Sequence, residues 1–279
     1  MSVNLTGVIN FYSHTKDGSF PWTDVTPKLG WTKSNYIQIP TQLPIYDLRG
    51  KENHFHLDIN GFEVHKYQGN IHNIFDHHTE EQQSYYEDIT NVLKNHLGVS
   101  RVIIFGHIIR FRGPPCPADR CDLNHKNPVL YPHVDDTPAS VKLKVIEILG
   151  EEEGQKLMKN RFQSINVWKP LGPNPIVNTP LAMCDYQSID VKNDIYSSDV
   201  IGSKNSVSLY IVSQKIKDTQ KWYYISNMRS NEMFIFKIFD SNPNVAQYAV
   251  HTAFINENVP STNTEQCSVE LRCLVFYDQ

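Results

Sequence analysis

The second half of the chain is a succession of short segments rich in aromatic and β-branched residues, separated by clusters of turn-forming residues. Segments of this length and composition are typical of strands, and several in a row predict an antiparallel, all-β core. The predicted strands are 162–168, 206–213, 222–226, 233–239, 248–254 and 269–277. An earlier apolar run at 102–105 predicts a further buried strand.

The first half of the chain carries helix signals. At 79–98, Thr79 is a suitable N-cap, acidic residues fill the first turn and Gly98 stands at the expected end. A second helix is predicted from 140 to about 149, and the acidic run 151–153 begins a further short helix. We expect one domain over 1–279: an N-terminal wrap at 1–45, flanking helices and first strands at 46–160, and the rest of the β core at 161–279.

Composition limits the classes of partner. The 279 residues are 40% hydrophobic and 20% charged, and a net charge of −4 without a basic block argues against nucleic acid. No apolar stretch approaches the roughly 20 residues that span a bilayer, and the start lacks a secretory pattern. Five scattered cysteines give no disulfide framework. We expect a cytoplasmic protein with a small-molecule partner and no membrane contact, and we leave a homodimer open.

A metal-binding pattern lies within this β framework. His133 and Asp135 are two residues apart, so on a strand they face the same side about 6–7 Å apart. His251 follows 118 positions later in another strand-like run, a separation that suits a barrel or jelly roll. Two imidazoles and one carboxylate bind ferrous iron on one face and leave three positions open for dioxygen and a co-substrate.

Two other clusters resemble metal sites less closely. His56 and Asp58 form a second His-x-Asp pair, for which a solvated strand face leading into an Asn-Gly turn is the simpler interpretation of 54–62. Cys116, Cys121 and His125 have a loose first spacing and no fourth ligand nearby, so we do not expect a zinc site there.

Further polar residues accompany the metal pattern. Arg272 lies on the last predicted strand, where a guanidinium can clamp a dicarboxylate such as 2-oxoglutarate, although a solvated strand face beside Glu270 is the alternative. Asn166 and Trp168 share strand parity and can face the interior together. Asn166 then donates to a carboxylate or satisfies neighbouring backbone groups.

Two pocket candidates remain open in role. Arg110 follows a buried strand and needs an anionic partner, which is either a substrate carboxylate or one of Asp47 and Asp58. We slightly favour an ion pair with Asp47 or Asp58 over a substrate carboxylate. Tyr131, beside the His-x-Asp pair, either shapes the pocket or packs.

Nine blocks of the sequence give a more specific indication. They are 46–50, 57–62, 105–110, 133–138, 166–171, 180–185, 222–224, 251–254 and 269–277. In this order they resemble the fungal hydroxylase/desaturase family that includes gibberellin-desaturase-like oxygenases, part of the iron/2-oxoglutarate double-stranded β-helix enzymes. The resemblance covers most of the chain and implies a double-stranded β-helix, or jelly roll, with flanking helices and an extended N-terminal segment.

The resemblance also implies cofactors and roles. His133, Asp135 and His251 would bind Fe(II), and Arg272 would hold the distal carboxylate of 2-oxoglutarate while O2 serves as oxidant. Three residues depart from the usual pattern, namely Lys169 in place of Arg, Gly106 in place of Asp, and Leu274 in place of a Ser found in many related oxygenases.

The implied reaction is hydroxylation, desaturation or oxidative cyclisation at an aliphatic C–H of a secondary-metabolite intermediate. An amino acid such as valine, closed to an aziridine, is one candidate substrate. On the residues alone, two other classes stay open: a non-redox jelly-roll isomerase or hydrolase, and a metal-free binding module.

Overall fold

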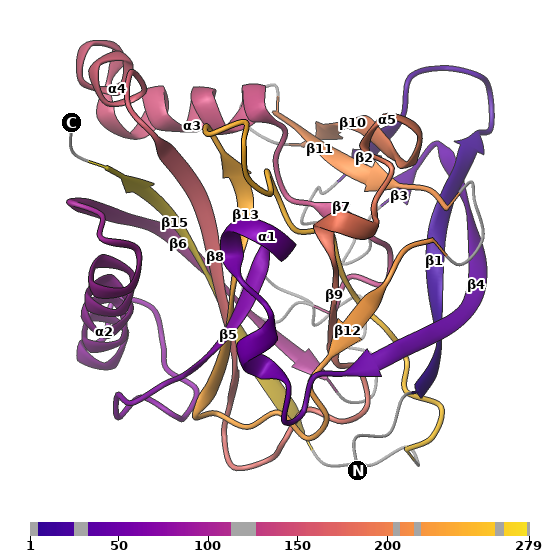
Figure 1. Ribbon diagram of the computed structural model, residues 1–279, viewed down its shortest axis with the longest axis horizontal. Coiled ribbons are helices and arrows are strands. Elements are labelled where there is room, and N and C mark those ends of the chain that lie inside the picture. Colours follow the sequence, from indigo (N-terminus) through magenta and orange to yellow (C-terminus); the bar gives the residue numbers. More distant parts are fainter. Residues whose placement is uncertain are drawn as a thin grey trace.

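Two facing sheets make up the body of the protein (Figure 1). The computed structural model describes residues 5–24, 33–112, 127–202, 207–214, 219–259 and 265–277. Within these ranges the larger sheet has ten strands in the order β1 (Leu5–Thr15), β4 (Tyr36–Asp47), β12 (Trp222–Tyr224), β9 (Leu181–Cys184), β14 (His251–Ala253), β7 (His133–Val134), β11 (Val207–Val212), β10 (Ile195–Ile201), β2 (Trp22–Asp24) and β3 (Lys33–Ser34). The smaller sheet has five in the order β5 (Phe62–Lys66), β13 (Glu232–Asp240), β8 (Phe162–Leu171), β15 (Gln266–Phe276) and β6 (Arg101–Arg112).

The smaller sheet is antiparallel throughout and has long, regular strands. β15 pairs with β8 on one side and with β6 on the other, and a bulge interrupts the β6 pairing between Arg272 and Cys273. Alternate residues along these strands therefore face either the larger sheet or the outside. The strand predicted at 102–105 is the first third of β6, which continues to Arg112.

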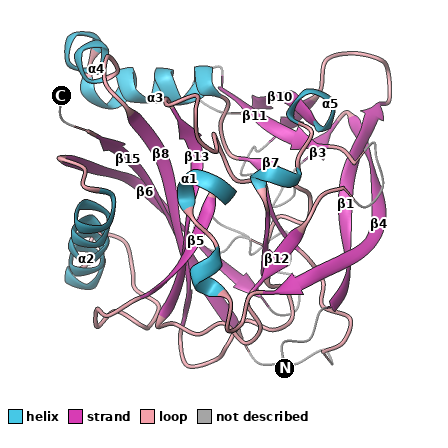
Figure 2. Cartoon of the chain, viewed as in Figure 1, coloured by secondary structure: helices cyan, strands magenta, loops and turns pink. Residues whose placement is uncertain are grey.

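The helices follow the predicted caps. α2 (Glu80–Leu97) begins after Thr79, whose side chain accepts from the Gln82 backbone, and ends at Gly98 in the left-handed region with φ 65°. α3 (Pro138–Leu149) and α4 (Glu151–Leu157) meet at Gly150. These helix predictions are confirmed. Short helical elements are η2 (Glu52–His54), α1 (Leu57–Asn60), η3 (Tyr186–Ser188) and α5 (Val191–Asp194). Figure 2 shows α2, α3 and α4 on the outside of the β body, with α1 near the centre of the view.

The strand predicted through 54–62 is wrong, because a turn of helix occupies most of it. The Asn60 side chain accepts from the His56 backbone N–H at 2.9 Å, and the Gly61 N–H bonds to Leu57 O. Gly61 has φ 85°, which a residue with a side chain rarely adopts, and β5 starts only after it. The alternation of polar residues predicted a strand and gave no sign of these local hydrogen bonds, which favour a helical turn.

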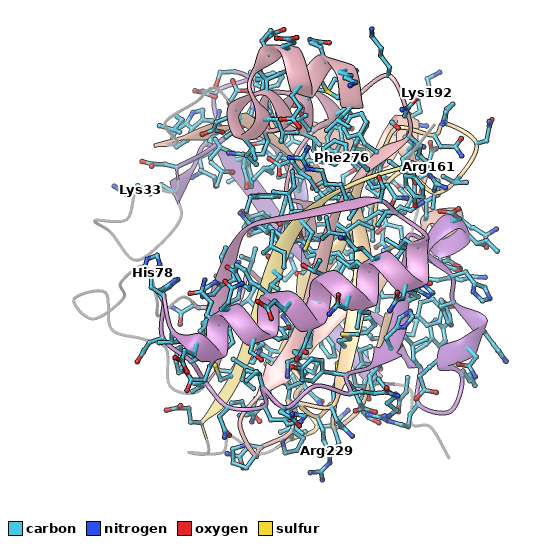
Figure 3. All side chains as sticks on the ribbon, turned by 90° about the vertical axis from the view of Figure 1, so that its left-hand side faces the viewer. Lys33, His78, Arg161, Lys192, Arg229 and Phe276 are labelled. Atoms are coloured by element: carbon cyan, nitrogen blue, oxygen red, sulfur yellow. The ribbon has the colours of Figure 1, made fainter. Side chains whose placement is uncertain are left out.

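Two apolar layers hold the elements together. One lies between the sheets and includes Trp168, Trp222 and Phe254. The other lies between the outer face of the smaller sheet and α2, where Tyr85, Ile89 and Leu93 are buried. Figure 3 shows α2 crossing that outer face. Within the described ranges, no helix has the length and apolar character needed to cross a membrane.

Candidate metal centre

Three potential ligands meet where two very short strands pair. β7 and β14 are antiparallel, and His133 stands opposite His251 with ring centroids 4.4 Å apart. Asp135 follows β7, and its Oδ1 lies 3.3 Å from His133 Nε2 and 3.8 Å from His251 Nε2. All three ligand atoms lie within 4.8 Å of one another, so these residues could hold a metal ion.

Backbone carbonyls set the orientation of both imidazoles. His133 Nδ1 lies 2.9 Å from Tyr131 O, and His251 Nδ1 lies 3.2 Å from Ala249 O. A carbonyl can only accept, so each Nδ1 carries the proton and each Nε2 presents its lone pair. Burial, together with the neighbouring His133, lowers the pKa of His251 to about 3. The ring is therefore neutral at physiological pH, as a metal ligand must be.

The second oxygen of Asp135 is held by two donors. Asn166 Nδ2 donates to Asp135 Oδ2 at 2.8 Å, and Arg272 Nη2 lies 3.2 Å from the same oxygen. Burial alone would raise the pKa of Asp135, but the positive charge of Arg272 outweighs it and holds the pKa well below its usual range. Asp135 is therefore an anion whose Oδ1 faces the two imidazoles.

Arg272 and Asn166 are cross-strand neighbours. They are paired in the β15–β8 register, and both side chains reach the interior at Asp135. Glu270, two residues before Arg272, is buried, with Oε1 3.6 Å from Nη2 of the half-buried Arg272. The alternative of a solvated strand face is therefore wrong for this part of β15. Among the described residues, Arg272 Nε is a buried donor with no hydrogen-bond partner.

A pocket next to the imidazoles carries two further cations. It is lined by residues that include Arg110, Arg112, Trp168 and Glu270. Arg112 is buried and donates to Thr179 O at 2.7 Å and to Ser268 Oγ at 2.6 Å, above the Trp168 ring. Burial and the nearby Arg110 lower the pKa of Arg112 to about 9.

Arg110 does not form the ion pair with Asp47 or Asp58 that we favoured from the sequence. Its Nη1 donates to Asn127 O at 2.8 Å. Asp47 accepts from two backbone N–H groups, and Asp58 forms ion pairs with Arg161 and Lys237. The structural pair with Asp47 or Asp58 is therefore wrong, and Arg110 lines the pocket instead.

Tyr131 contributes mainly through its backbone and its ring. Its carbonyl orients His133, and the two rings lie with centroids 5.3 Å apart. Burial raises the pKa of the phenol well above its ordinary value. Sequence reasoning missed Arg112 and Glu270 as pocket residues, although their i, i+2 spacing from Arg110 and Arg272 on strands was the available signal.

The three departures from the family pattern have distinct positions. Lys169 points away from the centre, donates to the carbonyls of Ile71 and Ser230, and lies 4.0 Å from the Tyr67 ring centroid. Gly106 is paired with Arg272, and a Cβ built there meets no atom of the described residues within 4 Å. Leu274 is buried in the core between the sheets. Cys116, Cys121 and His125, where we expect no zinc site, lie outside the described residues.

The fold and this donor set define a class: jelly-roll proteins that place two imidazoles and one carboxylate between their sheets. The sequence matches the family described as the oxidoreductase/YMDC permease-like domain over residues 9–276. The chain belongs to this family, and it is an Fe(II)/2-oxoglutarate-dependent dioxygenase related to fungal hydroxylase/desaturases. The family resemblance is thereby confirmed, and an enzyme of this class is neither a non-redox hydrolase nor a metal-free module.

Individual relatives align over nearly the whole chain. The hydroxylase/desaturase efuI of Hormonema carpetanum is 29% identical, and the alignment covers 99% of this chain and 96% of efuI. The Fe(II)/2-oxoglutarate-dependent dioxygenase nvfI of Aspergillus novofumigatus is 27% identical, with 90% and 89% covered. A solved structure of the iron and alpha-ketoglutarate-dependent endoperoxidase NvfI superposes with a TM-score of 0.81 at 24% identity, covering 99% of this chain and 98% of that one. The jelly-roll fold is thus shared.

Proposed function

We propose that His133, Asp135 and His251 hold the iron of this dioxygenase. The observation that carries the proposal is the convergence of two Nε2 lone pairs and one carboxylate oxygen within 4.8 Å. Imidazole and carboxylate suit Fe(II), and ligands on one face leave positions for dioxygen and a co-substrate. The backbone carbonyls that accept from each Nδ1 keep both rings in the ligating tautomer.

The co-substrate is assigned to Arg272 and Asn166. Arg272 Nε is a buried donor without a hydrogen-bond partner in the described part of the chain, and a guanidinium fork matches a carboxylate of 2-oxoglutarate bidentately. Among the described residues, nothing lies within 4 Å of a Cβ at Gly106, the cross-strand neighbour of Arg272, and this space would take that carboxylate. Asn166 holds Asp135 in place and stands opposite Arg272, where its amide can serve the co-substrate as well.

The substrate is proposed to be a small aliphatic carboxylate, with an amino acid such as valine as one candidate. Arg110 and Arg112 bring two positive charges to one pocket, and Glu270 offers a single carboxylate beside them. An anionic substrate would balance that excess. Arg110 would hold the acid and Trp168 and Leu181 would surround the hydrocarbon part, which directs an aliphatic C–H toward the imidazoles.

The bound iron, with O2 and 2-oxoglutarate, supplies an oxidant strong enough to remove hydrogen from an unactivated C–H, and the co-substrate leaves as succinate and CO2. The protein positions that C–H, excludes water and keeps Asp135 ionised. Hydroxylation adds one oxygen atom of O2 to the substrate, whereas desaturation or ring closure removes two hydrogens, which would leave with that oxygen atom as water. The product mass therefore separates these outcomes.

The iron assignment is tested by Asp135→Ala, with Asp58→Asn as the control in the other His-x-Asp pair. We expect Asp135→Ala to lose bound iron and the visible charge-transfer band of the anaerobic Fe(II)–2-oxoglutarate complex while the fold survives. Asp58→Asn should keep both signals. Iron content near wild type in Asp135→Ala would refute the assignment.

The substrate assignment is tested by following succinate release with mass spectrometry over a panel of amino acids, other small carboxylates and neutral polycyclic compounds. We expect carboxylates to trigger turnover and Arg110→Ala to raise the apparent substrate KM. Arg101→Ala, which removes a surface ion pair with Glu153, is the matched control. Turnover with neutral polycyclic compounds only, or an unchanged KM in Arg110→Ala, would contradict this assignment.

A further inference from the structure

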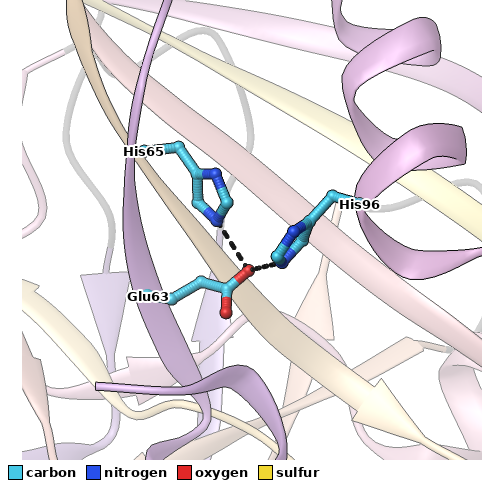
Figure 4. Close-up of side chains that lie close together, drawn as sticks. All are labelled: Glu63, His65 and His96. Carbon is cyan, nitrogen blue, oxygen red and sulfur yellow. Dashed lines mark hydrogen bonds and ion pairs between the residues drawn. The ribbon is translucent and has the colours of Figure 1, made fainter. Parts of the chain in front are cut away.

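A second cluster of imidazoles and a carboxylate lies on the outer side of the smaller sheet (Figure 4). Glu63 and His65 come from β5, and His96 comes from the last turn of α2. One ligand atom from each lies within 4.8 Å of the others. On β13, the register partners of Glu63 and His65 are Ile235 and Met233, which belong to the core beneath α2. The cluster is therefore separate from the centre between the sheets.

Local geometry makes the three side chains converge. Glu63 and His65 are two residues apart on a strand, so they share its outer face. His65 Nε2 lies 2.8 Å from Glu63 Oε1, and His96 Nε2 contacts the same oxygen. The two rings are nearly perpendicular, at 72°, with centroids 4.3 Å apart. Two ring nitrogens thus approach one carboxylate oxygen from two directions, as Figure 4 shows.

Among the described residues, the ionisable partners of Glu63 are two imidazoles, which carry a charge only when protonated, whereas several other carboxylates contact an arginine. Glu232 contacts Arg49, Asp240 contacts Arg161, and Asp135 contacts Arg272.

Glu63 is only 6% exposed, and within the described part of the chain its carboxylate contacts the two imidazoles and the Leu57 N–H, which lies 3.3 Å from Oε2. A buried carboxylate is costly without a countercharge. A divalent ion between the three groups would supply that charge, and the Leu57 N–H would fix the carboxylate's other oxygen as an outer-shell contact.

We propose that Glu63, His65 and His96 form a second metal site that binds Zn²⁺. Two imidazole nitrogens and one carboxylate oxygen are ligands that zinc accepts, whereas Mg²⁺ and Ca²⁺ prefer oxygen alone. Zinc also binds such a site more tightly than Fe(II). The side chains of His65 and His96 are 24% and 38% exposed, so solvent can reach the site and a water can complete four-coordination.

The site would join the C-terminal turn of α2 to β5, an edge strand of the smaller sheet. An ion held only when these two elements are docked stabilises the folded state in proportion to its free concentration. The role is structural and independent of the iron centre, so activity of the iron-loaded enzyme is not the readout.

The test uses the full chain carrying Asp135→Ala, which disables the first centre, after removal of metal with a chelator. Calorimetric titration with Zn²⁺ should show one equivalent bound, with a rise in Tm on zinc addition. Adding His96→Gln should weaken zinc binding at least tenfold and abolish the Tm rise, and His65→Gln should do the same. Adding His54→Gln, at an exposed histidine outside the cluster, should change neither.

The control variants also separate other sources of zinc binding. Zinc held by Cys116, Cys121 and His125 would persist in His96→Gln, and that persistence of the full equivalent would overturn the proposal. Absence of binding in the Asp135→Ala chain would equally overturn it, leaving the three side chains as a hydrogen-bonded cluster. The metal-free His96→Gln and His65→Gln chains should melt within a few degrees of their parent, which shows that the loss of binding is not a loss of fold.

Discussion

At the scale of residues, Asp135 divides its two oxygens between two tasks. Oδ1 faces His133 and His251, whereas Oδ2 receives Asn166 and Arg272. The donors on Oδ2 keep the carboxylate ionised and fix its plane, so Oδ1 is aimed at the position where the two Nε2 atoms point. Arg272 thereby links the ligand set to the place proposed for the co-substrate.

Arg272→Ala should raise the 2-oxoglutarate requirement. A charge-assisted hydrogen bond is worth about 1.5–3 kcal/mol, which corresponds to about 10- to 150-fold in Kd. Arg272→Lys should recover only part, because a point charge does not reproduce the fork. The measurement is titration of the anaerobic charge-transfer band. If both variants keep wild-type co-substrate dependence, the electrons come from another source, such as the substrate.

Substitutions at Gly106 test whether 2-oxoglutarate occupies the space beside Arg272. Gly106→Leu should fill the region beside Arg272 and weaken 2-oxoglutarate binding without loss of iron, while Gly106→Ala should have a smaller effect. Iron content and the charge-transfer titration are measured on the same samples. Equal co-substrate affinity in Gly106→Leu and wild type would mean that the co-substrate lies elsewhere.

At the scale of elements, the two strands that carry the histidines are very short, and long strands around them provide the rigidity. β7 has two residues and β14 has three, while β8 and β15 have ten and eleven. Ion pairs between side chains also connect the ends of neighbouring strands. Glu232, at the start of β13, binds Arg49 after β4 and Lys66 at the end of β5, the latter at 2.7 Å.

The ion pairs of Glu232 predict that the free energy of unfolding decreases at acidic pH. Burial would raise the pKa of Glu232, but hydrogen bonds from Arg49 and Lys66 lower it from 4.5 to about 2. Because the folded-state pKa is the lower one, the stabilisation is present above pH 4.5 and is lost as the pH falls toward 2. Glu232→Gln should cost about 1–3 kcal/mol at pH 7 and much less near pH 2, measured by urea unfolding.

The control for that measurement is Glu153→Gln, which removes an exposed ion pair with Arg101. Such surface pairs contribute little, so its free energy of unfolding should change by no more than about 0.5 kcal/mol at either pH. A Glu232→Gln cost that is the same at both values of pH would contradict the linkage.

At the scale of the whole molecule, the smaller sheet separates two apolar layers with different tasks. The inner layer surrounds the proposed metal centre, and the outer layer packs against α2 (Figure 3). Leu93 belongs to the outer layer and is fully buried. Substitutions in the outer apolar layer should therefore lower the free energy of unfolding without altering the geometry of the proposed ligands between the sheets.

Leu93→Ala should lower the free energy of unfolding by about 2–5 kcal/mol through lost burial and a cavity, while iron content per folded molecule stays at the wild-type level. Urea unfolding and metal analysis measure the two quantities. Leu143→Ala, at an exposed position on α3, should change stability by no more than about 0.5 kcal/mol. Loss of iron in Leu93→Ala at temperatures where the protein is folded would show that the layers are coupled.

Local sequence patterns, which span a few residues, were sufficient to predict many of the helices and strands of this protein. Thr79 and Gly98 cap α2 as predicted, because caps depend on neighbouring backbone groups. Short apolar runs predicted β8, β11, β12, β13 and β15, and three residues of the run at 248–254 form β14, whereas β9 and β10 were not predicted. The short separation of His133 and Asp135 in sequence predicted their proximity, although Asp135 lies just after β7 rather than on it. The resemblance of ordered blocks correctly indicated the jelly roll and the enzyme class.

Pairing between distant segments was decided only by the tertiary structure. The register that places His251 opposite His133, and the docking that brings His96 over Glu63 and His65, depend on which elements pack together. The carbonyl partner of Arg110 is likewise a non-local contact. Sequence spacing determines which side chains share a face of one element, but burial of the combined apolar surfaces selects the neighbouring element, and that choice belongs to the whole chain.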